Sequence, residues 1–514
     1  MIVRVAPVCK EGVNKVVNLS AFIAFHARHR PDHTAVIYGE RRVSYGEFDE
    51  RIRRLAALLT QRGIGEGDVV ALFMKNSPAF LDVAFATSYL GAVFLPVNFR
   101  LACEEVRYIL ADAGAKLLFV DEEFDAVHEL YDDTVVVDAA AQEDSRTLSD
   151  SSWPIPEPRP RRSDQLFRLM YTSGTTARPK GVMHSYENFY WKCMDHVIAL
   201  GLTGEDRLLT VGPLYHVGAF DLPGVALLWQ GGTLCLHREF DAEAALVSIE
   251  RHRLTCGWTA PVMLNQILAV ENPERFDLSS FRWCIGGGEK TPESRIRDFT
   301  RVFSAGRYID GYGLTETCSG DTLMESGMEI EKIGSTGRAL AHVQIRICDE
   351  QGFKLPANTE GEICLCGPKV TRGYWNAPDK TKESFFGDWF RSGDIGHLDE
   401  DGFLYVTDRR KDMILTGAEN VASSEVENVI YQLPEVAEAA VIGLPDENWG
   451  ERVVAVIVPR EGAELSYEML VTHCRKHLAN FKVPKQLLLS DALPRNPSGK
   501  ILKRKLRETY AGGA

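Results

Sequence analysis

The chain has 514 residues, more than one simple hydrophobic core accommodates, so its length predicts two or more domains. Hydrophobic residues make up 45% of it and charged residues 25%, values that are typical of globular proteins. The formal net charge of −14 disfavours a general nucleic-acid binder and a protein that coats anionic membranes. An anionic ligand would therefore have to be held by a few individual Lys and Arg side chains.

The 11 cysteines show no spacing typical of a metal site, and we interpret them as small hydrophobic core residues. Cys364 and Cys366 alternate along a predicted strand, which places both on one face of it. This many free thiols suit a reducing compartment. The sequence starts without a secretory leader pattern, and no apolar run reaches the length of a membrane span. These features predict a cytoplasmic protein.

Through the first 400 residues, short apolar runs alternate with longer helical patterns. Strands separated by helices predict α/β layers with largely parallel sheets. The predicted strands are 68–74, 116–120, 207–211, 233–237 and 282–285, and the predicted helices are 45–61, 104–111 and 241–251.

From about Val343 the pattern changes to short strands and turns at 343–348, 361–366 and 402–406, which predicts a small β-rich subdomain. After residue 412 the pattern becomes compact α+β. The elements predicted there are a helix at 424–432, strands at 437–442 and 452–458, and a helix at 467–478. We predict a domain boundary at Lys411, with a large domain over 1–410 and a small one over 411–514.

Residues 171–181 read YTSGTTARPKG and follow a predicted strand. Glycine lets backbone N–H groups approach a ligand closely, hydroxyls donate to phosphate oxygens and lysine adds a positive charge. Pro179 stands directly before Lys180, which differs from a P-loop, where the lysine opens a helix. The composition predicts a loop that grips a polyphosphate, and the alternative is a solvated surface loop.

The loop resembles the phosphate-binding signature of the AMP-forming acyl- and aryl-CoA synthetases, a superfamily that includes luciferases and peptide-synthetase adenylation domains. Ala177 stands where many members have glycine, a departure that removes no phosphate ligand. Five further segments resemble this superfamily, in its order and over nearly the whole chain. The resemblance implies an α/β fold, with a large N-terminal domain of layered α/β subdomains and a small β-rich subdomain, hinged to a small α+β C-terminal domain. It assigns phosphate binding to Thr172, Ser173, Gly174, Thr175, Thr176 and Lys180, with Thr176 also catalytic.

Residues 310–317 read DGYGLTET. The resemblance implies that Tyr312 stacks on adenine, Thr315 binds the α-phosphate and Glu316 binds Mg²⁺, a hard cation that prefers carboxylate oxygen. The resemblance assigns no other metal ligand than Glu316, and it also counts Glu316 among the catalytic residues. The other residues that it places around the nucleotide are Asp310, Gly311, Gly313, Gly288 and Glu289.

Three charged residues further along the chain complete the predicted nucleotide site. Asp394, in the run RSGD, resembles the carboxylate that binds both ribose hydroxyls. Residues 408–412 (DRRKD) resemble the hinge between the two domains, with Arg409 reaching the nucleotide and Lys411 at the pivot. Lys500, in PRNPSGKI, matches the lysine that enters the site in the first half-reaction, and two prolines and a glycine around it predict a tight turn.

The remaining assignments concern the acid and coenzyme A. His216 stands where the family places a residue beside the substrate carboxylate, although a lone histidine is more often structural. Gly417 matches the loop along the pantetheine channel. Trp449 and Phe481 stand where relatives stack the adenine of coenzyme A, and each is equally compatible with packing inside the small domain.

The resemblance implies an acid–thiol ligase that uses ATP, Mg²⁺ and coenzyme A. Rival interpretations are an amino-acid-activating domain, an oxygen-using luciferase-like enzyme and a non-catalytic nucleotide sensor. An amino-acid-activating domain needs an acidic residue near His216, and Asp221 lies close by without matching its position. The predicted pocket residues are small or apolar, which favours a medium or longer aliphatic acid, with an aryl or alicyclic acid close behind. The resemblance also makes a homodimer plausible.

Overall fold

The structure is a computed structural model that describes residues 18–138, 150–172, 179–287, 291–409, 412–416, 419–446, 449–495 and 500–511. The chain separates into two compact units, Met1–Trp191 with Tyr374–Asn376, and Lys192–Gly373 with Ala377–Ala514. The predicted domain boundary at Lys411 lies outside the described residues and stays a prediction.

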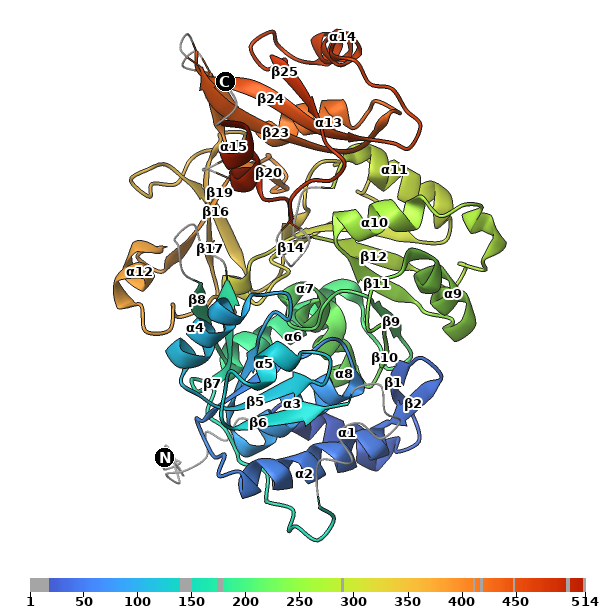
Figure 1. The fold of residues 1–514 in the computed structure, drawn as a ribbon, viewed down its shortest axis with the longest axis vertical. Helices are drawn as coiled ribbons and strands as arrows, with labels where there is room; N and C mark the ends of the chain where they lie inside the picture. The colour runs from blue at the N-terminus through green and yellow to red at the C-terminus, as the bar shows by residue number, and fades with distance from the viewer. Residues whose placement is uncertain are drawn as a thin grey trace, which may run out of the picture. The chain divides into compact units, whose positions relative to one another are not determined.

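The first unit is built on a six-stranded sheet with the order β6-β5-β3-β4-β7-β8 (Figure 1). All neighbouring strands are parallel except β8, which is antiparallel to β7. The strands are β3 (Val69–Phe73), β4 (Val93–Pro96), β5 (Ala115–Asp121), β6 (Thr134–Val137), β7 (Leu166–Thr172) and β8 (Lys180–Ser185). This alternation of parallel strands and helices confirms the predicted α/β architecture.

Helices of the first unit begin and end at residues whose chemistry suits those positions. The Ser44 hydroxyl caps α2 by accepting from the backbone N–H of Glu47. Ser77 caps α3, Pro78 occupies its first turn and Gly91 ends it in the left-handed conformation. The remaining elements form a β-hairpin and further helices. The bounds are α1 (Ser20–His29), β1 (Thr34–Tyr38), β2 (Arg41–Ser44), α2 (Tyr45–Gln61), α3 (Pro78–Leu90), α4 (Cys103–Ala113) and α5 (Asp125–His128).

In the second unit, five parallel strands lie in the order β13-β12-β11-β9-β10, and β14 and β15 extend the sheet beyond β13. The strands are β9 (Arg207–Thr210), β10 (Thr233–Leu236), β11 (Cys256–Thr259), β12 (Trp283–Gly286), β13 (Arg307–Tyr312), β14 (Thr322–Leu323) and β15 (Arg338–Ala339). The helices between them are α7 (Val217–Ala219), the π-helix η2 (Phe220–Gly224), α8 (Val225–Gln230), α9 (Ala242–His252), α10 (Pro261–Leu268), the 3-10 turn η3 (Pro273–Arg275) and α11 (Glu293–Val302), and α6 (Tyr186–Leu200) precedes them.

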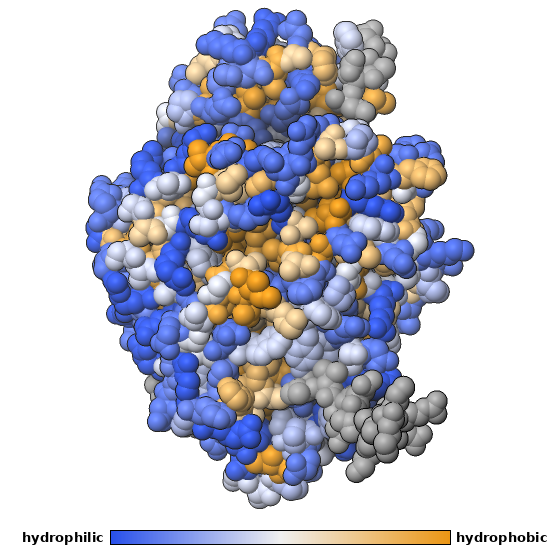
Figure 2. Space-filling model, turned by 180° about the vertical axis from the view of Figure 1, so that it is seen from behind, coloured by the Kyte–Doolittle hydropathy of each residue, from blue (hydrophilic) through white to orange (hydrophobic). Residues whose placement is uncertain are grey.

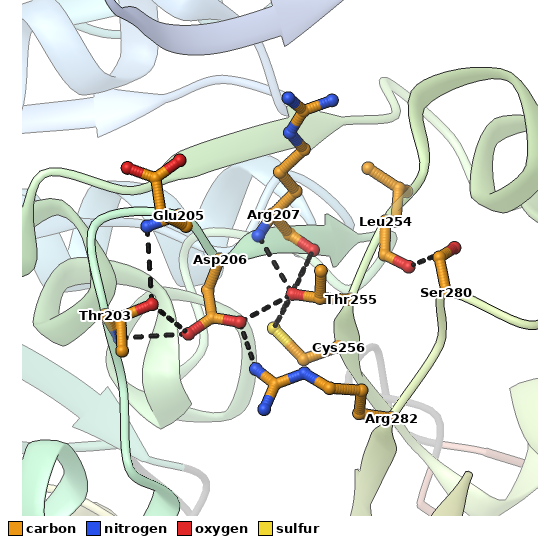
Figure 3. A network of polar contacts seen from close by, with 9 residues as sticks. All are labelled: Thr203, Glu205, Asp206, Arg207, Leu254, Thr255, Cys256, Ser280 and Arg282. Carbon is orange, nitrogen blue, oxygen red and sulfur yellow. Dashed lines mark hydrogen bonds and ion pairs between the residues drawn. The ribbon is translucent and has the colours of Figure 1, made fainter. Parts of the chain in front are cut away.

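Asp206, directly before β9, joins the amino ends of three of these strands (Figure 3). Its carboxylate accepts hydrogen bonds from the Thr203 backbone N–H at 2.9 Å and from the Thr203 hydroxyl at 3.1 Å. The Thr255 hydroxyl, before β11, donates to it at 2.8 Å, and Arg282, before β12, pairs with it. This network fixes the amino edge of the sheet. The loops that carry the predicted site residues leave the opposite, carboxyl edge, where ligands bind in open α/β sheets.

The predicted β-rich subdomain is confirmed as a five-stranded antiparallel sheet of β16 (Gln344–Cys348), β17 (Gly361–Cys366), β18 (Phe385–Phe386), β19 (Trp389–Leu398) and β20 (Leu404–Arg409). The helix α12 (Pro378–Glu383) precedes β18. Cys364 and Cys366 are free thiols, and Cys364 is fully buried. Among the described residues no group of three or more His, Cys, Asp or Glu side chains could hold a metal ion.

The C-terminal part is α+β, as predicted. Its sheet contains β21 (Ile414–Thr416), β22 (Glu419–Val421), β23 (Val436–Asp446), β24 (Gly450–Pro459) and β25 (Gln486–Leu489), and its helices are α13 (Ser423–Ile430), α14 (Tyr467–His477) and α15 (Lys503–Ala511). Successive residues of β23 point to opposite faces and join two separate apolar clusters. Val441 packs in one cluster with residues of α13 and α14, and Ile442 packs in the other with Leu506 of α15.

On the face drawn in Figure 2, hydrophilic side chains predominate, and hydrophobic ones gather in patches between them. Within the described residues, no helix has both the length and the apolar character that crossing a membrane requires.

Candidate active site

The predicted phosphate loop connects β7 to β8. Thr172 ends β7, Lys180 begins β8, and the two residues pair in the antiparallel ladder. Lys180 therefore opens a strand rather than a helix, as the preceding proline predicted. Below the loop, the Tyr171 hydroxyl donates to Asp112 at 2.5 Å, and burial together with the Asp112 carboxylate raises the pKa of Tyr171. Trp375 donates its indole N–H to the Asp112 backbone carbonyl at 3.1 Å and its backbone N–H to the Gly181 carbonyl at 2.7 Å, so the strand residues at both ends of the loop are held by contacts within the first unit.

The second predicted segment follows β13 and forms a compact turn. Thr315 and Glu316 lie in a single 3-10 turn, η4 (Thr315–Thr317). The Thr317 hydroxyl donates to the Asp321 carboxylate at 2.5 Å, and the backbone N–H of Thr371 donates to the Glu316 carbonyl at 2.7 Å. The backbone N–H of Cys318 donates to the Thr315 carbonyl at 3.1 Å, so the backbone of both residues that were assigned to the α-phosphate and to Mg²⁺ is held by neighbouring residues.

Three consecutive residues of this turn, Cys318, Ser319 and Gly320, have φ values of 56°, 67° and 63°. Left-handed conformations at two non-glycine residues are uncommon and need support from the surrounding structure. Lys369 supplies it, because its ammonium donates to the carbonyls of Ser319 and Gly320 and pairs with Asp321 at 3.0 Å. A side chain on Gly313 would lie 2.3 Å from the Gly320 nitrogen, so the turn also requires glycine there.

Tyr312 and Asp394 lie together although 82 positions separate them in the sequence. The Tyr312 hydroxyl donates to the Asp394 carboxylate at 2.8 Å, and burial together with the Asp394 charge raises the pKa of Tyr312. The aromatic ring and the carboxylate are thereby brought to one place, as a site for a nucleoside requires: a flat surface for the base and an acceptor for ribose hydroxyls. In the β19–β20 ladder Asp394 is paired with Arg409, whose side chain is outside the described structure.

His216 precedes α7 at the carboxyl edge of the sheet. Its Nδ1 accepts a hydrogen bond from the backbone N–H of Gly218 at 3.1 Å. Because Nδ1 is the acceptor, a neutral His216 ring carries its proton on Nε2, which makes Nε2 a hydrogen-bond donor. Such a donor is suited to an oxygen of a carboxylate.

Asp221, the acid close to His216, is not available to a ligand. Its side chain is fully buried and pairs with Lys192, also fully buried, at 3.2 Å. The ammonium of Lys192 also donates to the Asp221 backbone carbonyl at 3.2 Å. An amino-acid substrate would need an exposed carboxylate at this point, and Asp221 is committed to an internal ion pair.

In the C-terminal part, the loop before Lys500 is closed at its base by an isolated bridge between Arg495 and Ile501. The Leu502 backbone N–H donates to the Pro494 carbonyl at 2.7 Å, which joins the same two chain segments. Lys500 is half-buried directly next to this bridge.

The two predicted coenzyme A residues differ in their surroundings. Trp449 is 54% exposed, whereas Phe481 is partly buried and packs against the apolar cluster of the small domain. Trp449 therefore presents a ring to solvent, and Phe481 contributes to packing.

Several predicted residues lie outside the described part of the chain, so their assignments stay predictions. They are Ser173, Gly174, Thr175, Thr176, Gly288, Glu289, Lys411 and Gly417. Asp310 and Gly311 belong to β13, and Asp310 is buried. The sequence-based assignment missed Lys369, Asp321 and Lys192. A charged residue next to apolar ones, such as Lys369 before Val370, is the one sequence feature that could have indicated a buried charge, and it is a weak indication.

The donor set fits ATP with its metal ion. The second unit contributes an aromatic ring, a carboxylate acceptor and the hydroxyl and carboxylate of Thr315 and Glu316. Lys180 belongs to the first unit, where its ammonium lies 5.2 Å from the centroid of the Tyr374 ring. Carboxylate oxygen suits Mg²⁺, and hydroxyl and ammonium groups suit phosphate oxygens.

Comparisons with known proteins agree with this chemistry. Residues 23–375 match the family model of the AMP-binding enzymes, and residues 425–500 match that of the AMP-binding enzyme C-terminal domain. A feruloyl-CoA synthase from Amycolatopsis sp. is 38% identical over 94% of this chain and 97% of its own length. The long-chain-fatty-acid–CoA ligase FadD13 of Mycobacterium tuberculosis is 37% identical over 91% of this chain and 93% of its own length.

Among solved structures, the o-succinylbenzoate CoA synthetase of Bacillus subtilis, in complex with its acyl-adenylate intermediate, superposes with a TM-score of 0.85. It is 31% identical, and the match covers 95% of this chain and 97% of that one. The same enzyme has been solved with ATP and a magnesium ion. The chain thus belongs to the AMP-binding enzyme family and is an AMP-forming acid–thiol ligase.

Proposed function

We propose that this enzyme activates a hydrophobic carboxylic acid as its adenylate and then transfers the acyl group to coenzyme A. The observation that carries the proposal is the contact between Tyr312 and Asp394, beside the turn that bears Thr315 and Glu316. The contact supports the proposal because it joins a ring suited to the base with a carboxylate suited to ribose hydroxyls, three residues before the hydroxyl and carboxylate of the turn.

In the first half-reaction a carboxylate oxygen of the acid attacks the α-phosphorus of ATP, and the bond to the pyrophosphate oxygen breaks. Carboxylates are weak nucleophiles, so catalysis depends on positioning and on neutralising phosphate charge. Lys180, Thr315 and Lys500 would supply this neutralisation, and Nε2 of His216 would orient the acid. Mg²⁺ at Glu316 would add charge neutralisation. The coenzyme A thiolate then attacks the acyl carbonyl carbon, and AMP leaves with the bridging oxygen.

The relatives act on different acids, as their names state: feruloyl, long-chain fatty and o-succinylbenzoate. A fatty acid is therefore one candidate substrate and an aryl acid another. The burial of Asp221 in an ion pair with Lys192 argues against an amino acid, because no ammonium group of a substrate reaches that carboxylate.

The test is pyrophosphate release by the purified chain with ATP, Mg²⁺ and a panel of short, medium and long aliphatic, benzoate-type and cinnamate-type acids and amino acids. Each acid is assayed with and without coenzyme A. Turnover that requires coenzyme A and yields the thioester, identified by mass spectrometry, supports the proposal. Adenylate formation that ignores coenzyme A, or turnover confined to amino acids, contradicts it.

A further inference from the structure

A cavity of about 540 Å³ lies at the amino edge of the six-stranded sheet in the first unit. Residues at or next to the starts of four strands line it: Val69 of β3, Val93 of β4, Gly114 before β5 and Leu166 of β7. Its volume falls in the range of about 300–1,000 Å³ that is typical of small-molecule sites. All the residues that line it belong to the first unit, so this unit forms the cavity by itself.

The cavity is separate from the predicted phosphate loop. The strand β7 begins at Leu166, which lines the cavity, and ends at Thr172, where the loop begins. Six residue steps along a strand span about 20 Å. Among the described residues that line the cavity, none was assigned to the nucleotide, the acid or coenzyme A. A ligand bound here would therefore occupy a second site.

One wall of the cavity contains a buried arginine. Arg161 is only 3% exposed, although it belongs to a proline-rich segment and its neighbours Pro160 and Arg162 are exposed. A Cβ atom built on Gly91, whose φ is 71°, would lie 2.3 Å from Nη1 of Arg161, so the guanidinium lies directly against the backbone that ends α3. Cζ of Arg161 also lies 6.0 Å from the centroid of the Tyr186 ring. These contacts hold the positive charge in the cavity wall.

The charge of Arg161 is only partly compensated by the described residues. The Glu66 carboxylate lies 3.0 Å from Nη1, but the Glu66 side chain is 55% exposed and also accepts from the Gln165 amide at 2.9 Å. Nε of Arg161 is buried and has no hydrogen-bond partner among the described residues. A buried donor without an acceptor is costly, so an acceptor from outside the chain is expected at this point.

The remaining surface of the cavity is mostly apolar. Ala113, Leu169 and Trp375 line it together with the strand residues. Asp68, a further acid in the wall, already forms an ion pair with Lys116 at 2.6 Å. The cavity therefore offers apolar surface and one buried cation whose hydrogen-bonding capacity is not filled.

We propose that this cavity binds a small carboxylate with an apolar body, whose carboxylate pairs with Arg161 and whose body lies against Val93, Leu169 and Trp375. A carboxylate offers two acceptor oxygens, which match the parallel N–H donors of a guanidinium. The apolar body gains free energy by leaving water. A cationic ligand is disfavoured by Arg161, and an inorganic anion would leave the apolar wall uncovered. The proposal concerns binding alone and does not depend on the proposed function.

The experiment is calorimetric titration of the full chain, without ATP or coenzyme A, with 2-naphthoate and with its neutral analogue 2-naphthamide. We expect the wild type to bind 2-naphthoate about tenfold or more tightly than the amide, because only the carboxylate pairs with Arg161. Arg161→Met should remove this preference by weakening the binding of 2-naphthoate and leaving that of the amide within about twofold. Arg161→Lys, which keeps the charge, should retain part of the preference and serves if the methionine variant does not fold.

Two further variants locate the binding. Arg162 provides the matched control, because it belongs to the same segment but its exposed side chain pairs with Asp164. Arg162→Met should keep the wild-type preference for the carboxylate. Ala113→Phe places a ring in the cavity and should weaken the binding of both probes, and Ala113→Leu serves if that variant does not fold. In the wild type, 2-naphthoate should also change the fluorescence of Trp375, and Trp375→Phe should lose this change.

Three results would overturn the proposal. One is the absence of 2-naphthoate binding to the wild type. Another is binding that neither Arg161→Met nor Ala113→Phe alters, which would place the probe elsewhere on the protein. The third is equal weakening of 2-naphthoate and 2-naphthamide in Arg161→Met, which would show that Arg161 only supports the structure of the wall.

Discussion

The ammonium of Lys369 lies 3.0 Å from the carboxylate of Asp321, and both side chains are completely buried. Asp321 also accepts from the Thr317 hydroxyl, and Lys369 also binds two carbonyls of the same turn. The pair thus connects a distant segment to the turn that carries Glu316. The pair is therefore expected to hold Glu316, the predicted metal ligand, in position.

Removal of one partner should unfold or weaken this turn, because the other charge would stay buried without compensation. We expect Lys369→Met to lower the free energy of unfolding by about 3–5 kcal/mol in urea titrations. In the folded fraction the apparent KM for MgATP should rise, since Glu316 loses its fixed position. Lys380, whose ion pair with Glu383 is exposed, provides the control variant Lys380→Met, for which no measurable change is expected. An unaltered KM for MgATP would show that the pair does not position Glu316.

Asp394→Asn should weaken ATP binding while the fold persists. The amide still accepts a hydrogen bond from Tyr312 but removes the charge on the acceptor for the ribose hydroxyls. We expect the KM for ATP to rise by about 10- to 100-fold, equivalent to about 1.5–3 kcal/mol. Initial-rate kinetics at saturating acid measure this effect. Tyr312→Phe, which keeps the ring and removes only the hydroxyl, should have a smaller effect, and the reverse order would contradict the assigned roles.

His196 should make the protein less stable at acidic pH. It is buried beside Lys192 and Lys369, and its Nδ1 lies 3.2 Å from the Asp221 carbonyl oxygen. Burial, reinforced by the two lysines, holds the pKa of His196 well below its ordinary value of 6.5. The unfolded chain then binds a proton below pH 6.5 that the native protein does not, so native stability falls as pH decreases through that range.

Between pH 6.5 and 5.5 this linkage amounts to about 1 kcal/mol. The slope of unfolding free energy against pH, measured in urea, should therefore be smaller in His196→Gln than in the wild type. Ile198→Gln, an exposed position on the same helix, should retain the wild-type slope. Equal slopes in all three proteins would exclude His196 as the source.

Asp206→Asn should destabilise the protein without altering its chemistry. The side chain accepts hydrogen bonds from Thr203 and Thr255 and pairs with Arg282, all at the amino edge of the sheet. We expect a loss of about 1.5–3 kcal/mol in unfolding free energy, with kcat and KM unchanged. Asp277, which forms an exposed ion pair with Arg253, provides the control Asp277→Asn, which should be neutral. A change in KM for ATP or acid would contradict the separation of the two edges.

Lys500→Ala should lose pyrophosphate formation by about 10²–10³ in rate, the effect of removing one charge-stabilising donor. It should still convert a supplied acyl-adenylate and coenzyme A to the thioester, because the lysine is proposed to act in adenylation alone. The two half-reactions are measured separately, by pyrophosphate release and by thioester formation. Equal impairment of both would refute this division of labour.

Much of the fold was predictable because local patterns and tertiary structure agree. The predicted helix at 45–61 coincides with α2, where a serine cap and an apolar stripe act together. The strand predicted at 361–366 coincides with β17, whose four central residues are all buried, as a short apolar run in a covered sheet allows. Ends of other elements differ by one or a few residues, as for β12, which begins at Trp283 rather than at residue 282.

The sequence by itself determined the chemistry of this protein. Short runs such as YTSGTTARPKG and DGYGLTET hold their characteristic residue types within a few positions, so local spacing alone was enough to predict the family. Only the tertiary structure decided which side chains meet across long separations. Tyr312 with Asp394, Lys369 with Asp321 and Trp258 with Gly218 are brought together by strand order and loop packing, and no local pattern records such contacts. The burial of Asp221 was also decided by the tertiary structure. The sequence does not distinguish an aspartate that faces a ligand from one that pairs with a buried lysine, as Asp221 does with Lys192.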